Sequence, residues 1–395
     1  MKSFLNPFRP GAGQFPPYLA GRKAAFSDYE KLLLQEPVIK NLVITGLRGV
    51  GKTVLLEAFK PIAIKSEWFW AGTDMSESAS VSEQTLAIRI LADLSAVLSS
   101  FSLPEENGQA AVKLSYAVLM TIYNETPGLE VDKLKKVLEV IWDAVKGKVK
   151  GIVIAYDEAQ NLRDHAKDKQ YPLSVLLEAI QYLQRKQIPY LLILTGLPTL
   201  YPTLLETRTY TERMFHIITI DRLSDAECRE AITDPIKKEN VQVTFEEDAI
   251  DHIILLSGGY PYFIQFLCKE AFDSFLQQQA VGIKNPTVRM GEIVAKLDAD
   301  FYSARWNLIT ERQKDLLRII AQLPTANEEF TLQDIAFLAK AAEIPSFTPS
   351  YINQYLNKLK DQGLVYKNGH GRYSFAVPML AGYINRKGEE EVGSG

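Results

Sequence analysis

A glycine-rich loop at residues 46–53 sets the tightest limit on how this chain can fold. The loop reads Gly-Leu-Arg-Gly-Val-Gly-Lys-Thr, and it lies between an apolar segment, residues 41–45, and a segment with helical character, residues 52–59. The pattern G-x-x-x-x-G-K-[ST] between a strand and a helix brings several backbone N–H groups to one point, because glycine permits the close turn. We therefore expect a phosphate group to bind at this loop, next to the positive end of the helix.

The residue types in the loop predict ATP with Mg²⁺ as the ligand. Lys52 would bridge the β- and γ-phosphates, and Thr53 would give its hydroxyl to Mg²⁺. The alternative is a glycine-rich turn that binds nothing, and the flanking strand and helix disfavour it. The other predicted nucleotide contacts in this segment are Gly46, Leu47, Arg48, Gly49, Val50, Gly51 and Val54.

An acidic pair follows a second apolar segment. Asp157 and Glu158 come directly after residues 151–156, at the carboxyl end of a predicted buried strand, where ligands bind in such sheets. Asp157 is suited to hold Mg²⁺ through its water shell, and Glu158 is suited to polarise the attacking water. The alternative is an acidic pair that caps the following helix.

Two further positions are candidates for catalysis. Thr195 ends the predicted strand at residues 190–195, so its hydroxyl could reach the γ-phosphate or the attacking water. Arg213 stands just before residues 215–220, and Arg208 lies nearby. Either arginine could stabilise transferred charge as an arginine finger, and the competing interpretation is an ordinary surface arginine.

The apolar pattern predicts an α/β fold with a parallel sheet covered on both faces, because short apolar strands alternate with amphipathic helices. The expected strands are residues 41–45, 68–71, 151–156, 190–195 and 215–220. Helices are expected at residues 52–59, 82–99, 109–124, 131–145 and 173–185, with exposed loops at 104–107 and 163–170.

Later in the chain the pattern changes twice. Only helices are expected after residue 222, and Ser224 with Glu227 forms a capping box at the first of them. Three helices and two short strands then follow, in the order of a winged helix-turn-helix: residues 311–322, 332–339, 349–362, 364–366 and 373–377. The expected domains are an α/β domain with an N-terminal arm (1–222), a helical lid (223–305), a winged helix (306–387) and a flexible tail (388–395).

With these motifs the chain resembles the AAA+ superfamily of P-loop ATPases, in the branch of Orc/Cdc6-like, TniB-like and STAND proteins. The resemblance extends from about Asn6 to Arg386 and includes Ala20-Gly21-Arg22, Asp157-Glu158-Ala159-Gln160, Thr195-Gly196-Leu197-Pro198 and Gly258-Gly259-Tyr260-Pro261. It implies that Arg22, Tyr260 and Pro261 lie near the adenine. It also implies a helical lid beside the sheet and slow, Mg²⁺-dependent ATP hydrolysis.

The predicted winged helix raises the question of DNA binding. Residues 349–362 carry an apolar stripe and an opposite polar face, and Lys358, Lys360 and Arg372 could contact DNA phosphates, with Lys367 and His370 nearby. Ten Lys/Arg against seven Asp/Glu between Thr310 and Lys387 predict at most modest, salt-sensitive binding. The alternative, implied by the STAND resemblance, is a winged helix that packs on the ATPase core and restrains it.

Bulk composition excludes several classes of protein. The net charge of −4 argues against an obligate, strongly basic nucleic-acid coat, and Cys228 and Cys268 are expected to be buried and reduced. There is no run of about 20 apolar residues and no secretory pattern at the start, so we expect a cytoplasmic protein without a membrane segment.

The favoured hypothesis is an ATP-hydrolysing switch that engages DNA or a DNA-processing partner. An arginine finger acting in trans would require a homo-oligomer. One alternative is a STAND-like scaffold in which ADP/ATP exchange controls assembly with a protein partner. Another is a DNA-binding regulator whose nucleotide site is structural.

Overall fold

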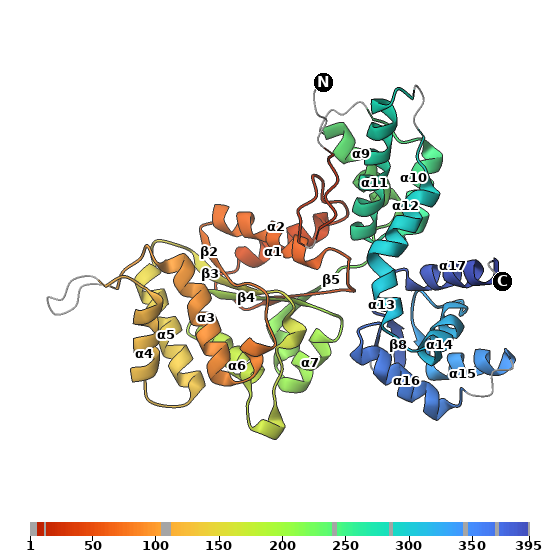
Figure 1. The fold of residues 1–395 in the computed structure, drawn as a ribbon. Helices are drawn as coiled ribbons and strands as arrows, with labels where there is room; N and C mark the ends of the chain where they lie inside the picture. The colour runs from red at the N-terminus through yellow and green to blue at the C-terminus, as the bar shows by residue number, and fades with distance from the viewer. Residues whose placement is uncertain are drawn as a thin grey trace. The chain divides into compact units, whose positions relative to one another are not determined.

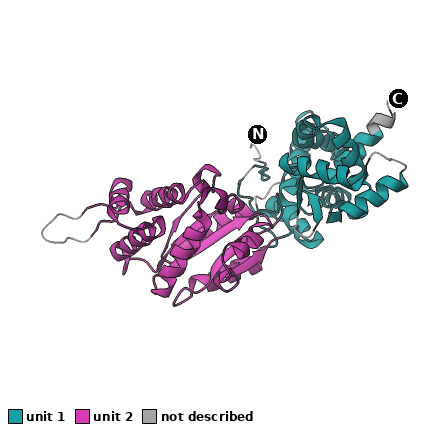
Figure 2. Ribbon diagram, turned by 90° about the horizontal axis from the view of Figure 1, so that it is seen from below, with its two compact units in different colours: residues 1–21, 47–51, 221–395 teal, residues 22–46, 52–220 magenta. Residues whose placement is uncertain are grey.

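The computed structural model describes two compact units (Figure 2). The α/β unit comprises residues 22–46 and 52–220, and the helical unit comprises residues 1–21, 47–51 and 221–395. Within these ranges, the described residues are 6–11, 13–103, 112–238, 243–283, 287–342, 347–367 and 371–393.

The centre of the α/β unit is a parallel sheet in the order β2-β3-β4-β1-β5. Every residue of β1, β3 and β4 is buried, which explains why these strands are apolar throughout instead of alternating. All five predicted strands are confirmed, with ends that differ by at most one residue. Their bounds are β1 Asn41–Thr45, β2 Trp68–Ala71, β3 Gly151–Tyr156, β4 Tyr190–Gly196 and β5 Phe215–Thr219.

Helices cover both faces of this sheet, with α1 and α2 on one face and α3, α6 and α7 on the other (Figure 1). The helices of the unit are α1 Lys23–Leu33, α2 Lys52–Lys65, α3 Glu83–Leu98, α4 Tyr116–Glu125, α5 Glu130–Val145, α6 Pro172–Arg185, α7 Leu200–Thr207 and α8 Thr211–Met214. The helix predicted from Gln109 is wrong in its start: α4 begins at Tyr116, because the Ser115 hydroxyl caps it by accepting from the Val118 N–H. Residues 104–111, including the loop predicted at 104–107, lie outside the described residues.

The first helices of the helical unit, α9 to α13, form a bundle. The predicted capping box is confirmed, since the Ser224 N–H donates to Glu227 Oε2 at 2.8 Å and the Glu227 N–H donates back to Ser224 Oγ. The bounds are α9 Asp225–Lys238, α10 Glu247–Ser257, α11 Pro261–Ala280, α12 Met290–Leu297, a π-helical turn Asp298–Tyr302 and α13 Ser303–Asn307.

The N-terminal arm belongs to the helical unit, whereas we expected it in the α/β domain. Phe8 packs against Phe245 and Phe272, with ring centroids 6.3 and 6.4 Å apart. The Asn6 side chain donates to Asp273 Oδ1 at 2.7 Å. Aromatic burial and a long-range hydrogen bond therefore attach the arm to α11.

The C-terminal module, residues 310–393, has the element order expected of a winged helix-turn-helix. It contains an antiparallel sheet in the order β6-β8-β7. Strand β6 was not predicted, because it has only two residues. The bounds are α14 Glu311–Ala321, β6 Phe330–Thr331, α15 Leu332–Ala341, α16 Pro349–Asp361, β7 Val365–Lys367, β8 Arg372–Phe375 and α17 Leu380–Gly393.

Two expectations about this end of the chain are corrected. Helix α17 continues to Gly393, where a flexible tail was expected from residue 388. The C-terminal module also forms one compact unit with the helical bundle, whereas we expected a separate domain from residue 306. Tyr302 explains the fusion, because its ring stacks on Tyr383 at 4.9 Å and its hydroxyl donates to the Pro378 carbonyl at 2.9 Å.

Cys228 and Cys268 are free and buried, as predicted. Across the described residues, none of the helices combines the length and the apolar character needed to cross a membrane.

Candidate functional site

The carboxyl ends of β1, β4 and β3 lie side by side and place the predicted residues at one edge of the sheet. Thr45 at the end of β1 pairs with Gly196 at the end of β4, and Tyr156 at the end of β3 pairs with Leu194. Strand β4 therefore separates the strand that leads into the glycine-rich loop from the strand that leads into Asp157. Ligands of parallel sheets bind at this edge.

Thr53 and Asp157 meet directly across this edge. The Thr53 hydroxyl, on the first turn of α2, donates to Asp157 Oδ2, while Asp157 Oδ1 accepts from the Glu158 N–H at 2.8 Å. Asp157 is 3% exposed, and burial raises its pKa, although these two hydrogen bonds and the charge of Lys52 act in the opposite direction. Keeping this carboxylate ionised therefore has a net free-energy cost, and a cation beside it would lower that cost.

Thr195 lies on β4, the strand between β1 and β3, and has an unsatisfied hydroxyl. Its residue is fully buried beside Ile44 of β1, and its Oγ1 atom has no hydrogen-bond partner among the described residues. A buried hydroxyl without a partner is costly, so a group that bonds it would gain that free energy on binding. This is the position from which we predicted a contact to the γ-phosphate.

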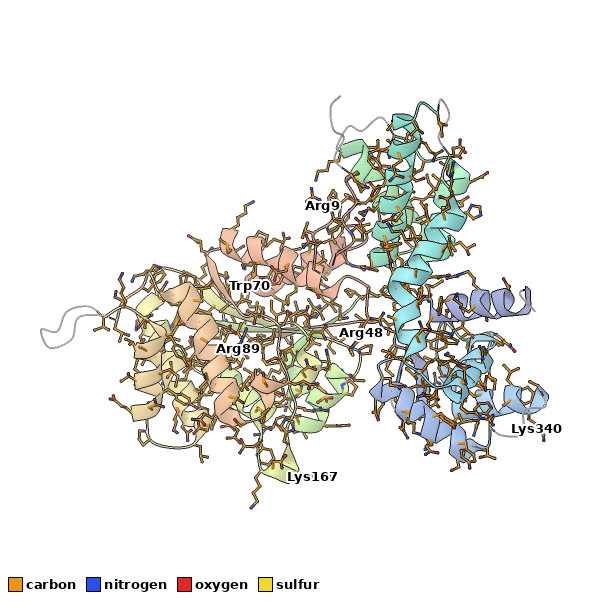
Figure 3. The ribbon with its side chains drawn as sticks, viewed as in Figure 1. Arg9, Arg48, Trp70, Arg89, Lys167 and Lys340 are labelled. Carbon is orange, nitrogen blue, oxygen red and sulfur yellow. The ribbon has the colours of Figure 1, made fainter. Side chains whose placement is uncertain are left out.

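The glycine-rich loop connects β1 to α2 in the way that its sequence predicts. Gly49 and Gly51 have φ values of +80° and +94°, a backbone conformation that residues with a side chain rarely adopt. A Cβ on Gly51 would meet no atom within 4 Å. Arg48, labelled in Figure 3, is exposed, and Lys52 at the start of α2 is buried. The open space at Gly51 agrees with a loop whose N–H groups are accessible to a phosphate.

The backbone at Glu158 is unusual. This residue is exposed and has φ +50° and ψ +32°, the left-handed region, which costs a non-glycine residue roughly 1 kcal/mol. Its carboxylate accepts a hydrogen bond from the side-chain amide of Gln160. The motif Asp157-Glu158-Ala159-Gln160 contains this glutamine, but nothing in the local sequence indicates that its side chain contacts the Glu158 carboxylate.

The residues predicted near the adenine are distributed over both units. In the helical unit Tyr260 is 4% exposed, burial raises its pKa to about 12, and Pro261 begins α11. A Cβ on Gly49 would lie 3.8 Å from the Tyr260 ring, so this tyrosine lies near the glycine-rich loop. Arg22 is buried at the start of α1, in the α/β unit. A shared role of Arg22, Tyr260 and Pro261 at an adenine stays a prediction.

Arg213 and Arg208 lie away from this edge. Arg213 is exposed on α8, which leads into β5 at its amino end, where Phe215 pairs with Asn41. The length of a five-residue strand, roughly 16 Å, therefore separates it from the carboxyl edge of its own sheet. Arg208 pairs with Glu178 at 3.5 Å, and its Nε atom is buried. The more exposed Arg213 is the better placed of the two to reach another molecule.

Solved structures of low sequence identity share this fold. A Walker-type ATPase of Pyrococcus abyssi is 18% identical, with a TM-score of 0.58 over 93% of this chain and 96% of that chain. The ORC2 protein of Aeropyrum pernix in its ADP form is 16% identical, with a TM-score of 0.53 over 95% and 96% of the two chains. The family described as Domain of unknown function (DUF8462) matches residues 299–384, and no curated protein matches the chain.

Proposed function

We propose, from the premise that this chain has the fold of Orc/Cdc6-type AAA+ ATPases, that it binds ATP with Mg²⁺ and hydrolyses it. The observation that carries the proposal is the meeting of Thr53 and Asp157 at the carboxyl edge of the sheet. Such ATPases give two protein groups to the metal. One is a hydroxyl at the start of the helix that follows the glycine-rich loop. The other is a buried carboxylate from the strand two positions away in the sheet.

The residues at this edge fit Mg²⁺ bound together with a triphosphate. Thr53 and Asp157 supply hard oxygen atoms, and the net cost of burying the Asp157 carboxylate favours a cation beside it. Within the described residues no group of three or more His, Cys, Asp and Glu residues gathers, so the remaining ligands would come from water and phosphate. Mg²⁺ bound here would neutralise charge on the β- and γ-phosphates.

The same edge supplies the groups for hydrolysis. Glu158 takes a proton from a water molecule whose oxygen attacks the γ-phosphorus, and the bond from that phosphorus to the β–γ bridging oxygen breaks. Lys52 compensates charge on the phosphates, and the unpartnered Thr195 hydroxyl donates to a γ-phosphate oxygen. The products are ADP and inorganic phosphate.

We further propose that the nucleotide state controls engagement of DNA through the C-terminal module. Helix α16 buries Ile352, Leu356 and Leu359 and leaves Lys358 and Lys360 exposed. Arg372 is also exposed, but Glu329 pairs with it at 3.0 Å, so it would have to exchange that partner for a phosphate. Lys367 is exposed, and His370 lies outside the described residues.

A second candidate function follows from one contact within the helical unit. A Cβ on Gly49 would lie 3.6 Å from Pro378, so the segment between β8 and α17 lies next to the glycine-rich loop. Such a contact favours the STAND-like alternative, in which the C-terminal module restrains the nucleotide site and exchange of ADP for ATP releases it toward a protein partner.

Nucleotide binding is tested by calorimetry of the purified chain with ATP and ADP, with and without Mg²⁺, beside a Lys52→Ala variant. We expect Lys52→Ala to weaken ATP binding at least about tenfold, because it removes a charged phosphate contact. Lys60→Ala, an exposed lysine on the same helix, serves as the control. Equal ATP affinity of Lys52→Ala and the parent would refute the proposed site.

The two candidate functions differ in what they predict for DNA. Glu158→Gln should retain ATP and lower turnover about 10²–10⁴-fold under both of them, because it removes the general base. If DNA affinity of this trapped form then equals that of the ADP-bound parent at every salt concentration, the DNA proposal fails and the scaffold remains.

A further inference from the structure

We infer that Gln160 is a positioning residue that ties Glu158, the group that activates water, to the end of β4, which senses the γ-phosphate. The inference rests on the proposed function and extends it to a residue with no assigned role. Two hydrogen bonds and one close approach carry it.

The side-chain amide of Gln160 bridges two parts of the site. Its Nε2 group donates to Glu158 Oε2, and its Oε1 atom accepts from the Leu197 backbone N–H at 3.1 Å. Leu197 follows Gly196, the last residue of β4, and Thr195 precedes it. The carboxylate of Glu158 is therefore linked through one side chain to the segment that carries the unpartnered Thr195 hydroxyl.

The space for this link exists because residue 196 has no side chain. A Cβ atom at Gly196 would lie 2.6 Å from Gln160 Oε1, closer than real contacts allow. The neighbouring Asn161 side chain makes a separate contact and donates to the Met75 carbonyl at 2.9 Å. Within the same 3₁₀ turn, Ala159–Asn161, it is the amide of Gln160 that is hydrogen-bonded to the segment after β4.

The chemistry of water activation explains why such a link matters. An exposed glutamate samples several rotamers, and a general base is effective only within hydrogen-bond reach of the water. The amide of Gln160 selects one orientation of the Glu158 carboxylate, beside the strand end that would contact the γ-phosphate. A shift of that strand end on phosphate binding would move the Leu197 N–H, and with it the carboxylate.

The test compares steady-state hydrolysis and nucleotide affinity of three variants with the parent. Gln160→Ala removes both hydrogen bonds, and Gln160→Glu keeps the size and the acceptor for Leu197 but removes the donor to Glu158. Gly196→Ala displaces the amide without changing it. Asn161→Ala is the matched control, because it removes a hydrogen bond of similar length from the same turn and leaves Glu158 alone.

We expect all three variants to lower kcat at least about tenfold, while the affinity for ATP measured by calorimetry changes less than about threefold. Asn161→Ala should keep the parental kcat. In a double-mutant cycle, Gln160→Ala should cause no further loss in a Glu158→Gln background, because Gln160 acts through that carboxylate.

Distinct outcomes separate the two levels of the argument. Parental kcat in Gln160→Glu, or an equal loss in Asn161→Ala, overturns the role of Gln160 and leaves the ATPase proposal intact. Additive losses in the double-mutant cycle also overturn it. Absence of ATP binding or turnover in the parent overturns the proposed function, and the inference with it.

Discussion

Asp157 shows how a single residue is kept at a cost to stability. Burial raises its pKa above the usual value, so the folded protein favours the protonated carboxyl more than the unfolded chain does. Its contribution to stability is therefore most favourable at low pH, and stability is lost as the pH rises from about 3.8 through the folded pKa. Under the proposed function, a cation bound beside this carboxylate would offset the cost.

Asp157→Asn should therefore raise the Tm of the nucleotide-free protein at pH 7, with a gain that shrinks as the pH falls toward 4. The same change should abolish the dependence of ATP binding on Mg²⁺, because a neutral amide is a poor ligand for that ion. Thermal melts over this pH range, beside Asp143→Asn at an exposed ion pair, measure the first effect. A lower Tm of Asp157→Asn at neutral pH would contradict the expectation.

The elements of the sheet also depend on a residue that sequence patterns did not single out. Gly72 follows β2 with φ +131°, and a Cβ there would lie 1.8 Å from the carbonyl oxygen of Ala155 in β3. This close approach of two backbones is possible only for glycine. It sets the course of the chain from β2 to Asp74, whose backbone forms an isolated parallel β-bridge with Asp157.

Gly72→Ala should consequently destabilise the protein by more than about 3 kcal/mol, because the clash is with backbone that cannot move aside. Gly147→Ala is the matched control, since its φ of +78° is also left-handed but nothing lies within 4 Å of the added atom. We expect that control to cost about 1–2 kcal/mol, the conformational term alone. Urea unfolding of both variants measures the difference, and equal midpoints would show that the clash is relieved without cost.

How much the sequence could predict also varies between elements. The five strands follow from apolar runs, and the meeting of Thr53 with Asp157 follows from two motifs at strand ends. The start of α4 depends on a Ser115 cap, and the two residues of β6 form a strand only because Tyr373 and Arg372 of β8 pair with them. The link from Gln160 to Leu197 joins two loops, so no local pattern in the chain encodes it.

At the scale of the whole molecule, the position of Arg213 predicts an assembly. Arg213 lies at the amino edge of the sheet, a strand length from Thr53 and Asp157 at the carboxyl edge. It can therefore act on a γ-phosphate only in a neighbouring copy. An oligomer of identical chains would pair the Arg213 of each copy with the site of the next.

Mixing two inactive variants tests this arrangement. Arg213→Ala keeps an intact nucleotide site and Lys52→Ala keeps an intact arginine, so mixed oligomers should hydrolyse ATP although neither variant does so alone. We expect a 1:1 mixture to regain roughly a quarter of parental turnover if subunits exchange at random, with subunit exchange verified by light scattering and labelled chains. No recovery after demonstrated exchange would place Arg213 outside the reaction.

The C-terminal module has no net positive charge, because ten Asp/Glu residues balance its ten Lys/Arg residues over 310–393, and any DNA binding must therefore depend on local contacts. Lys358→Glu on the exposed face of α16 should weaken binding to duplex DNA and reduce the slope of log affinity against log salt by about 1. Lys60→Glu on α2 changes the net charge equally and should leave the slope unaltered. Fluorescence anisotropy with ATP and with ADP measures the DNA affinity of both variants across the salt series. Equal effects of the two variants would mean that net charge alone attracts DNA, whereas a loss confined to Lys358→Glu and to one nucleotide state would assign α16 as the contact that the nucleotide controls.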